Sequence, residues 1–152
     1  MRIVVQRVKQ ASVSVSGDTA GQIGRGLLVL LGVAREDHRA EADYLIRKLT
    51  ELRIFPDDDG KMNLSVKEAG GALLVVSQFT LYADCRRGRR PGFDRAAAPD
   101  QARELYEYFV REAGRSGVAV ATGVFQAHME VSLVNDGPVT IIIDSPDTPA
   151  NA

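Results

Sequence analysis

The sequence predicts an α+β fold, a mostly antiparallel β-sheet or barrel-like domain with two helices packed on it. Stretches with the apolar runs or alternation typical of strands outnumber those with helical spacing. Only residues 37–52 and 99–113 repeat apolar side chains at intervals of three and four, and these two stretches lie far apart in the chain. Together these observations favour one sheet with both helices on one side.

The first third of the chain is predicted to form three strands. Residues 3–15 alternate apolar and polar side chains, but the phase slips around 7–10, which indicates a long strand with a β-bulge. Gly17-Asp18 predicts a hairpin turn before a short return strand at 22–24. Residues 26–33 form an almost wholly apolar run, which predicts a buried strand.

Residues 37–52 then switch to helical spacing, with Asp37 as the expected N-cap. The predicted buried stripe consists of Ala42, Leu45, Ile46, Leu49 and Leu52. Residues 53–55 are expected to form a short strand. The Asp-rich segment 56–61 is expected to be a solvated hairpin turn, because it lacks the spacing of a calcium loop.

The stretch 70–81 is the centre of the fold prediction. A double glycine and five apolar residues, 72–76, predict a strand buried on both faces, after which Ser77, Gln78 and Thr80 place polar side chains at its end. Unpaired polar groups leaving a buried strand cost roughly 1–3 kcal/mol each. These side chains therefore either cap the neighbouring turn or form a site in which a ligand supplies the partners.

A basic segment follows at once, and glycine and proline predict that it is a loop. Its four arginines are Arg86, Arg87, Arg89 and Arg90. A basic loop beside a pocket suits a phosphate-bearing ligand, and the alternative is an ordinary solvated loop. Cys85 adjoins the arginines, but no histidine lies near it in sequence, which argues against a catalytic thiol.

The last third is predicted to contain a helix and three strands. Pro99 fits the first turn of the helix, whose buried stripe consists of Ala102, Leu105, Tyr106, Phe109 and Ala113. The strands are expected at 118–122, 128–134 and 139–144. The Asn135-Asp136-Gly137-Pro138 segment between the last two is typical of a turn, and its Gly-Pro pair can hold a cis peptide. We expect a single domain, 1–145, and a frayed tail, 146–152.

Composition excludes several classes of protein. The net charge of −1 means that nucleic-acid contact must come from a local basic patch. No apolar run approaches the roughly 18 residues of a membrane span, and no signal-peptide core is seen. A single cysteine excludes an internal disulfide and suits the cytoplasm. One cysteine and two histidines argue against a zinc cluster, so no metal or cofactor is expected.

The motifs together resemble one known family. Ser77-Gln78-Phe79-Thr80 and residues 135–140 match the first and second signatures of the D-aminoacyl-tRNA deacylases, at the right separation in a chain of the right length. Further segments also fit: 1–8, 62–64, 90–93 and 129–133. Either signature alone is weak, but both together are specific, and the resemblance covers nearly the whole chain.

The resemblance implies a homodimer that hydrolyses the ester between a D-amino acid and the 3′ end of tRNA, a chiral proofreading step. Glycine mischarged on tRNA(Ala) is implied as a second substrate. Gly137 and Pro138, joined by a cis peptide, would enter the partner's pocket and face residues 77–80. Their carbonyls would bind the α-amino group, so that an L side chain collides with backbone.

The implied chemistry uses no protein nucleophile. Both histidines lie far from the signatures in sequence, so no Ser-His-Asp set is apparent, and nothing obvious deprotonates Thr80, the best side-chain candidate. The resemblance implies that the 2′-OH of the terminal adenosine assists a water. Phe79 would donate its N–H to the oxyanion, while Ser77, Gln78 and Thr80 shape the pocket.

Other residues are assigned to substrate binding by the resemblance. Phe125 would lie near the adenine and Met129 beside the substrate, while the four loop arginines would bind tRNA. One departure is Gln126, where the family's Gly-x-Phe-Gly stretch has a second glycine. Ser77 favours the D-specific enzyme over a paralogue that tolerates some L-substrates.

Two other functions remain open from the sequence. One is a non-catalytic RNA-binding module that uses the 86–90 loop. The other is a small-molecule hydrolase that uses Thr80 or Cys85.

Overall fold

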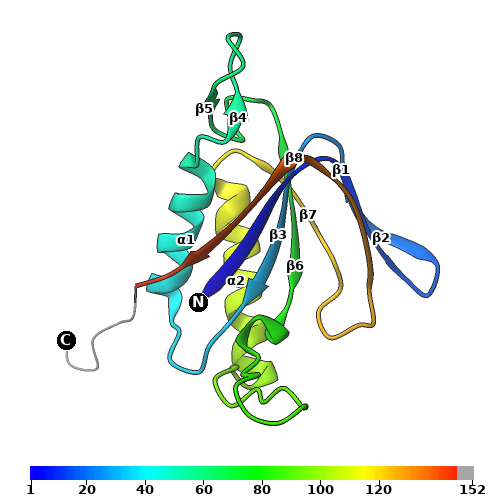
Figure 1. Ribbon diagram of the computed structural model, residues 1–152, viewed down its shortest axis with the longest axis vertical. Coiled ribbons are helices and arrows are strands. Elements are labelled where there is room, and N and C mark those ends of the chain that lie inside the picture. Colours follow the sequence, from blue (N-terminus) through cyan, green and yellow to red (C-terminus); the bar gives the residue numbers. More distant parts are fainter. Residues whose placement is uncertain (147–152) are drawn as a thin grey trace.

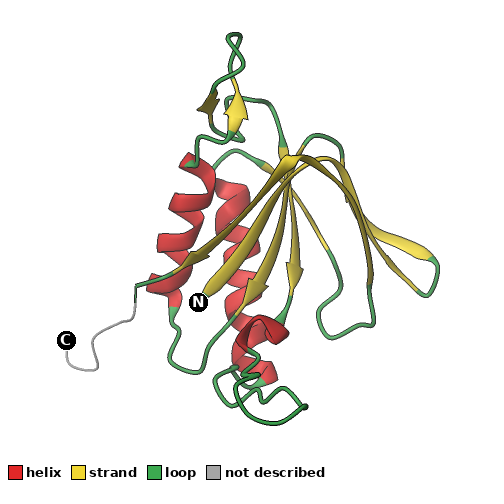
Figure 2. Ribbon diagram, in the orientation of Figure 1, coloured by secondary structure: helices red, strands yellow, loops and turns green. Residues whose placement is uncertain are grey.

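The computed structural model describes residues 1–146, in which one sheet fans across two helices (Figures 1 and 2). Of the predicted tail, the part beyond Pro146 lies outside the described residues. In chain order the elements are β1 (Arg2–Val15), β2 (Asp18–Ile23), β3 (Gly26–Gly32), α1 (Arg39–Glu51), β4 (Phe55–Pro56), β5 (Met62–Leu64), β6 (Ala72–Ser77), the 3-10 helix η1 (Phe79–Tyr82), α2 (Pro99–Arg115), β7 (Ala119–Thr122) and β8 (Glu130–Asp144).

The main sheet has the strand order β2-β1-β3-β6-β7, with β8 also paired to β1. Strand β1 pairs antiparallel with β2, β3 and β8, whereas β3-β6 and β6-β7 are parallel. Strand β2 approaches β7 closely at Gly21. A Cβ added to this glycine would lie only 2.2 Å from the carbonyl oxygen of Thr122. The predicted α+β fold with a barrel-like, mostly antiparallel sheet is confirmed.

The two parallel pairs place both helices on the same face of the sheet (Figure 2). Parallel neighbours need a crossover, and here α1 lies between β3 and β6 in the chain, and α2 between β6 and β7. Strand β6 is buried on both faces, as predicted. Leu73 and Val75 pack in the core that includes the helices, while Leu74 and Val76 belong to a second apolar cluster.

Helix α1 begins two residues later than predicted, at Arg39. Its N-cap is His38, whose N–H donates to the Glu41 carboxylate at 2.7 Å, as in a capping box. The Asp37 carboxylate instead accepts from the α-amino group of Met1 and from the Ala34 N–H. The prediction of Asp37 as the cap was therefore wrong, because a stronger, charged partner from the chain start occupies this carboxylate.

The C-terminal strands also differ from the prediction. Residues 128–134 and 139–144 belong to one long strand, β8, because both halves pair antiparallel with β1. Residues 136–139 of β8 lie opposite the single residue Arg7, between the pairs Gln6–Thr140 and Val8–Asn135. The predicted turn is therefore an outward bulge of a continuous strand, and it coincides with the bulge predicted in β1 at 7–10.

Candidate functional site

The end of β6 carries the first signature into a tight 3-10 turn. Ser77 pairs with Leu31 of β3, and the Gln78 N–H donates to the Leu31 carbonyl at 2.8 Å. The Gln78 amide then donates to the Thr80 hydroxyl. These two side chains therefore partner each other.

A pocket of about 630 Å³ opens where β6 ends. It is lined by residues from the strand end, from α2 and from the segment before β8, among them Ser77, Gln78, Phe79, Tyr106, Phe125 and Met129. The fold thus brings the first signature together with two predicted substrate-binding residues that lie about fifty residues away in sequence. None of the described residues that line this pocket is an acid, a lysine or an arginine.

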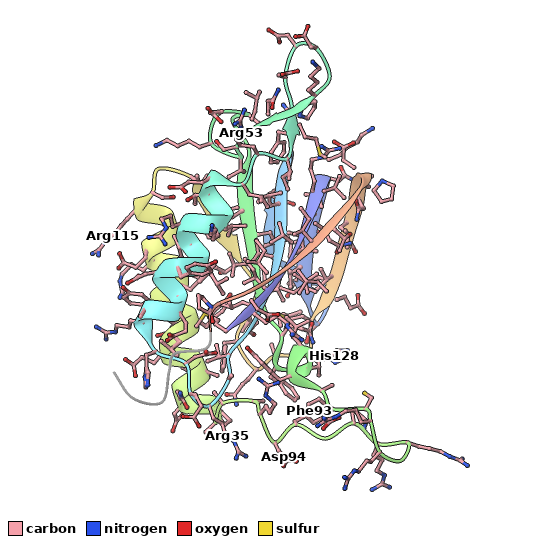
Figure 3. All side chains as sticks on the ribbon, turned by 60° about the vertical axis from the view of Figure 1, so that its left-hand side comes forward. Arg35, Arg53, Phe93, Asp94, Arg115 and His128 are labelled. Carbon is pink, nitrogen blue, oxygen red and sulfur yellow. The ribbon has the colours of Figure 1, made fainter. Side chains whose placement is uncertain are left out.

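Phe79 faces the solvent at the edge of this pocket, with 57% of its surface exposed. Its ring packs edge-to-face on Phe93, with centroids 5.0 Å apart and planes at 66°. Phe93 stands at the base of the arginine loop (Figure 3). This aromatic contact fixes the loop base against the first signature.

Tyr106 anchors the strand behind the pocket. Its buried hydroxyl donates to the carbonyl of Val75, two residues before Ser77, at 2.9 Å. Burial raises the pKa of Tyr106 to about 12, so the hydroxyl remains a donor at neutral pH. The Tyr106 ring also contacts Phe125, with centroids 5.7 Å apart. The sequence gives Tyr106 only as part of a buried stripe, since helical periodicity does not show which strand a hydroxyl reaches.

His128 also lines the pocket, although it lies about fifty residues from the first signature in sequence. Figure 3 shows it at the same end of the molecule as Phe93. Because no carboxylate lines the pocket within the described residues, His128 has no acidic partner there, and no hydrogen bond joins Thr80 to an imidazole among these residues. A Ser-His-Asp or Thr-His arrangement is therefore not formed by the described residues of this pocket.

The second signature lies elsewhere, in the bulge of β8. The Gly137–Pro138 peptide bond is cis, and both residues are exposed. The Asn135 side chain accepts from the Val139 N–H at 2.8 Å and donates to the Thr140 hydroxyl at 3.0 Å, which ties the two ends of the bulge together. Gly137 and Pro138 are not among the residues that line the pocket of their own chain.

Arg7 supports this bulge and was missed by the sequence reasoning. Its buried guanidinium donates from Nε to the carbonyl of Asp136 at 3.0 Å and from Nη1 to the carbonyl of Ile54. The Asp136 carboxylate lies 3.6 Å from Arg7 Nε. The available signal was an arginine at the point where the apolar alternation of residues 3–15 slips, since a cation buried there must have partners.

The arginine loop is closed at its base by backbone bonds between Asp84 and Gly92. Arg86 is paired with Asp84 at 2.6 Å, and this ion pair holds the pKa of the Asp84 carboxyl well below its usual range. The other three arginines are exposed and pair with no carboxylate of the described residues. They are Arg87, Arg89 and Arg90. Of the four predicted tRNA-binding arginines, Arg86 is thus already neutralised within the chain.

In the described part of the chain, no group of three or more His, Cys, Asp and Glu side chains is arranged to hold a metal ion. None of the described helices is long and apolar enough to cross a membrane.

Comparison with known proteins places this architecture in a class. A protein named D-aminoacyl-tRNA deacylase from Symbiobacterium thermophilum is 64% identical to this chain, over 97% of this chain and 98% of that protein. A protein of the same name from Clostridioides difficile is 60% identical, over 95% of this chain and 97% of that protein. A solved structure titled c-Myc DNA unwinding element binding protein superposes with a TM-score of 0.90 at 41% identity, over 96% of this chain and 99% of that one. A second, titled as a probable eukaryotic D-amino acid tRNA deacylase, shares the fold with a TM-score of 0.76 at 20% identity, over 94% of this chain and 98% of that one.

A model of the D-Tyr-tRNA(Tyr) deacylase family matches residues 4–144, and the chain belongs to this family. The resemblance predicted from the two signatures is therefore confirmed, and with it the class of enzyme, a hydrolase that cleaves an ester.

Proposed function

We propose that this protein hydrolyses the ester of D-aminoacyl-tRNA in the cytoplasm, releasing the D-amino acid and free tRNA. Glycyl-tRNA mischarged on tRNA(Ala) is proposed as a second substrate. The observation that carries the proposal is the position of the first signature of this deacylase family, of which Ser77, Gln78 and Phe79 line a pocket of about 630 Å³. Such a volume suits a small ligand group of the size of an aminoacylated nucleoside.

The proposed chemistry relies on positioned backbone groups rather than on a side-chain nucleophile. Ester hydrolysis needs donors for the developing oxyanion. The Phe79 N–H begins η1 and has no acceptor among the described residues, as expected for the first N–H groups of a helical turn. This supports Phe79 as the oxyanion donor. The nucleophile is then a water assisted by the 2′-OH of the terminal adenosine.

Chiral selection is proposed to come from a second copy of the chain. The Gly137–Pro138 bulge of one protomer would enter the pocket of its partner, where its carbonyls bind the substrate's α-amino group. The exposure of this bulge and its rigid support by Arg7 favour such a role. Exposed apolar side chains on the same strand also favour an interface: Val131, Val134 and Ile142.

The remaining assignments concern the 3′ end of the tRNA. Phe125 and Met129 line the pocket and are proposed to contact the terminal adenosine and the amino acid. Arg87, Arg89 and Arg90 are proposed to bind tRNA phosphates, since each is exposed and unpaired among the described residues. Arg86 belongs to the same loop but is expected to contribute less, because Asp84 already neutralises it.

The decisive experiment compares hydrolysis of D-Tyr-tRNA and L-Tyr-tRNA at equal enzyme concentration. We expect rapid release of D-tyrosine and no release of L-tyrosine above the uncatalysed rate. Equal rates on the two substrates would remove chiral selection from the proposal. Absence of turnover on both would remove the deacylase activity itself.

A non-catalytic nucleic-acid-binding module is the alternative, and the three unpaired loop arginines are the observation that favours it. Replacement of all three by glutamine separates the two functions. For a deacylase, the variant raises KM for D-Tyr-tRNA and flattens its dependence on salt, while kcat is retained. For a binding module, tRNA binding is salt-dependent but no deacylation accompanies it.

A further inference from the structure

Arg103 of α2 lies beside the pocket, a position that no sequence pattern predicts. Its guanidinium carbon sits 4.7 Å from the centroid of the Phe125 ring, and its Nη2 donates to the side-chain oxygen of Gln126 at 3.0 Å. The side chain is exposed and forms no ion pair within the described residues, although Asp100 and Glu107 lie one turn away on the same helix. Arg103 is therefore a free cation held in one place by an aromatic ring and an amide.

Gln126 has a backbone conformation that few non-glycine residues adopt. Its φ is +64°, in the left-handed region where glycine is favoured. This explains how a glutamine occupies the position where the family pattern has glycine: the backbone keeps the glycine-like conformation. The glutamine side chain then supplies what glycine cannot, an acceptor for Arg103.

The consequence is a change in the surface that Phe125 presents to a ligand. Arg103 lies over this ring, and Tyr106 packs against it at 5.7 Å. Phe125 lines the pocket and Arg103 does not, so the guanidinium lies over the ring outside the lining, at the rim. A flat ligand that reaches this rim can stack on the guanidinium. A guanidinium is planar and stacks on nucleobases, and its charge also attracts a nearby phosphate.

The electrostatics of the pocket make this cation important. No acid, lysine or arginine lines the pocket among the described residues, and His128 is the one titratable side chain besides Tyr106 in that lining. Arg103 is thus a fixed positive charge at the edge of an otherwise uncharged cavity. A positive charge at this edge attracts the phosphates of a nucleic acid, while the uncharged cavity can receive a neutral nucleoside.

We propose that Arg103 is a substrate-binding residue that stacks on the terminal base of the tRNA, and that Gln126 is the positioning residue that holds its guanidinium in the stacking plane. Phe125 then backs the guanidinium of Arg103 and still forms the pocket wall beside the adenosine. This proposal rests on the proposed deacylase function, because that function brings the 3′ end of tRNA to this pocket.

The first test measures steady-state kinetics of Arg103→Gln on D-Tyr-tRNA at fixed salt. We expect KM to rise about tenfold, the loss of one base stack, with kcat within about twofold of the wild type. Arg111→Gln is the matched control, since Arg111 lies at 5.3 Å over Tyr108, which does not line the pocket, whereas Arg103 contacts the lining residues Phe125 and Gln126. An unchanged KM for Arg103→Gln, or an equal rise for Arg111→Gln, overturns the proposal.

Arg103→Lys separates stacking from charge, because lysine keeps the positive charge but lacks the planar guanidinium group. We expect KM of Arg103→Lys to remain at least about fivefold above the wild type, whereas recovery of the wild-type KM overturns the stacking role.

Gln126→Gly keeps the backbone conformation and removes the acceptor. We expect a threefold or so rise in KM alone and no further rise when it is combined with Arg103→Gln, since the two residues act as one unit. Additive effects overturn the positioning role of Gln126.

Uncharged tRNA serves as a competitor that does not depend on turnover. The inhibition or binding constant is measured for intact tRNA and for tRNA that lacks the terminal adenosine. Arg103→Gln is expected to weaken binding of intact tRNA about tenfold and to leave the truncated tRNA unaffected. Equal weakening of both means a general phosphate contact and overturns the base-stacking proposal. Because this is a binding assay, its result stands even if the wild type proves inactive on D-Tyr-tRNA, an outcome that would remove the proposed function alone.

Discussion

The two signature segments are held in the molecule in different ways. Residues 77–80 end a strand buried on both faces, and backbone pairing to β3 fixes them at the pocket. Residues 136–139 bulge out of β8, and side chains hold them there, chiefly Arg7 and Asn135. One segment is thus part of the sheet, while the other is an exposed feature attached to it.

Their positions also differ. Ser77 is level with Leu31 and, through it, with Ile3 of β1, whereas the bulge lies opposite Arg7 and on the other side of β1. In a single chain, two strands of the sheet, β3 and β1, therefore lie between the two segments. If both act on one substrate, as we propose, they must come from different protomers, and each should respond to mutation in its own way.

The largest expected effect follows from changing Gly137 to alanine. Gly137 has a φ of +142°, and an added Cβ would lie 2.8 Å from Val139 Cγ2 and 2.9 Å from its backbone nitrogen, so the bulge must distort. We expect D-Tyr-tRNA deacylation to fall by two orders of magnitude or so, with only about 1–3 kcal/mol lost from the unfolding free energy.

Gly114→Ala is the control, because nothing lies within 4 Å of its added Cβ in α2. It should keep full activity and gain about 0.5–1 kcal/mol of stability. Activity of Gly137→Ala within threefold of the wild type would contradict a catalytic role for the bulge.

Replacing Arg7 by glutamine should produce the next effect. The change removes the charged donor to the carbonyls of Asp136 and Ile54 and leaves Asp136 without its cation. We expect a stability loss of about 2–4 kcal/mol in urea unfolding and a fall in deacylation of about tenfold or more.

Arg53→Gln offers a comparison, because exposed Arg53 also donates to a carbonyl, that of Asn63 at 2.7 Å. It should cost less than about 1 kcal/mol and leave activity unchanged. Equal effects of the two changes would show that the bulge does not depend on its buried support.

A smaller effect is expected at the first segment from Thr80→Ala. The Thr80 hydroxyl accepts from Gln78 and contacts no base among the described residues, so its loss should free the Gln78 amide and slow kcat only about three- to tenfold.

Cys85→Ala should leave kcat unchanged. Complete loss of single-turnover hydrolysis in either variant would mean that a side-chain nucleophile is used after all.

The smallest effect on activity is expected from Tyr106, whose contribution shows in stability at high pH. Its pKa is raised from 10.0 to about 12 by burial, so the neutral form is favoured in the folded state. The stability linked to this group is therefore complete below pH 10 and is lost as the pH rises toward 12. We expect the unfolding free energy to fall by about 2–3 kcal/mol across that window.

Tyr106→Phe should reduce this fall and cost about 1 kcal/mol at pH 7 through the lost bond to Val75. Burial also raises the pKa of Tyr82, so part of the fall in unfolding free energy with pH should remain in this variant. A pH dependence identical in wild type and variant would contradict the assignment.

Much of the fold was predictable because local patterns report burial directly. The apolar run of β6, the bulge in β1 and the stripes of both helices were read correctly, since periodicity reveals which face of an element is covered. The parallel pairing of β3, β6 and β7 was not specified, because pairing depends on crossovers that periodicity does not encode. Likewise, Asp37 has the residue type of a cap, but its partner is the distant amino group of Met1.

The sequence by itself determined the α+β class, the two signatures and hence the family, because these depend on residue types at fixed spacings. Only the tertiary structure decided that Phe125, Gln126 and His128 share a pocket with Ser77, and that Arg7 and Arg103 support the two sides of the proposed chemistry. The physical reason is that a hydrogen bond or a ring contact joins groups by distance in space, and the strand register and helix crossovers that set those distances arise only when the whole sheet is assembled.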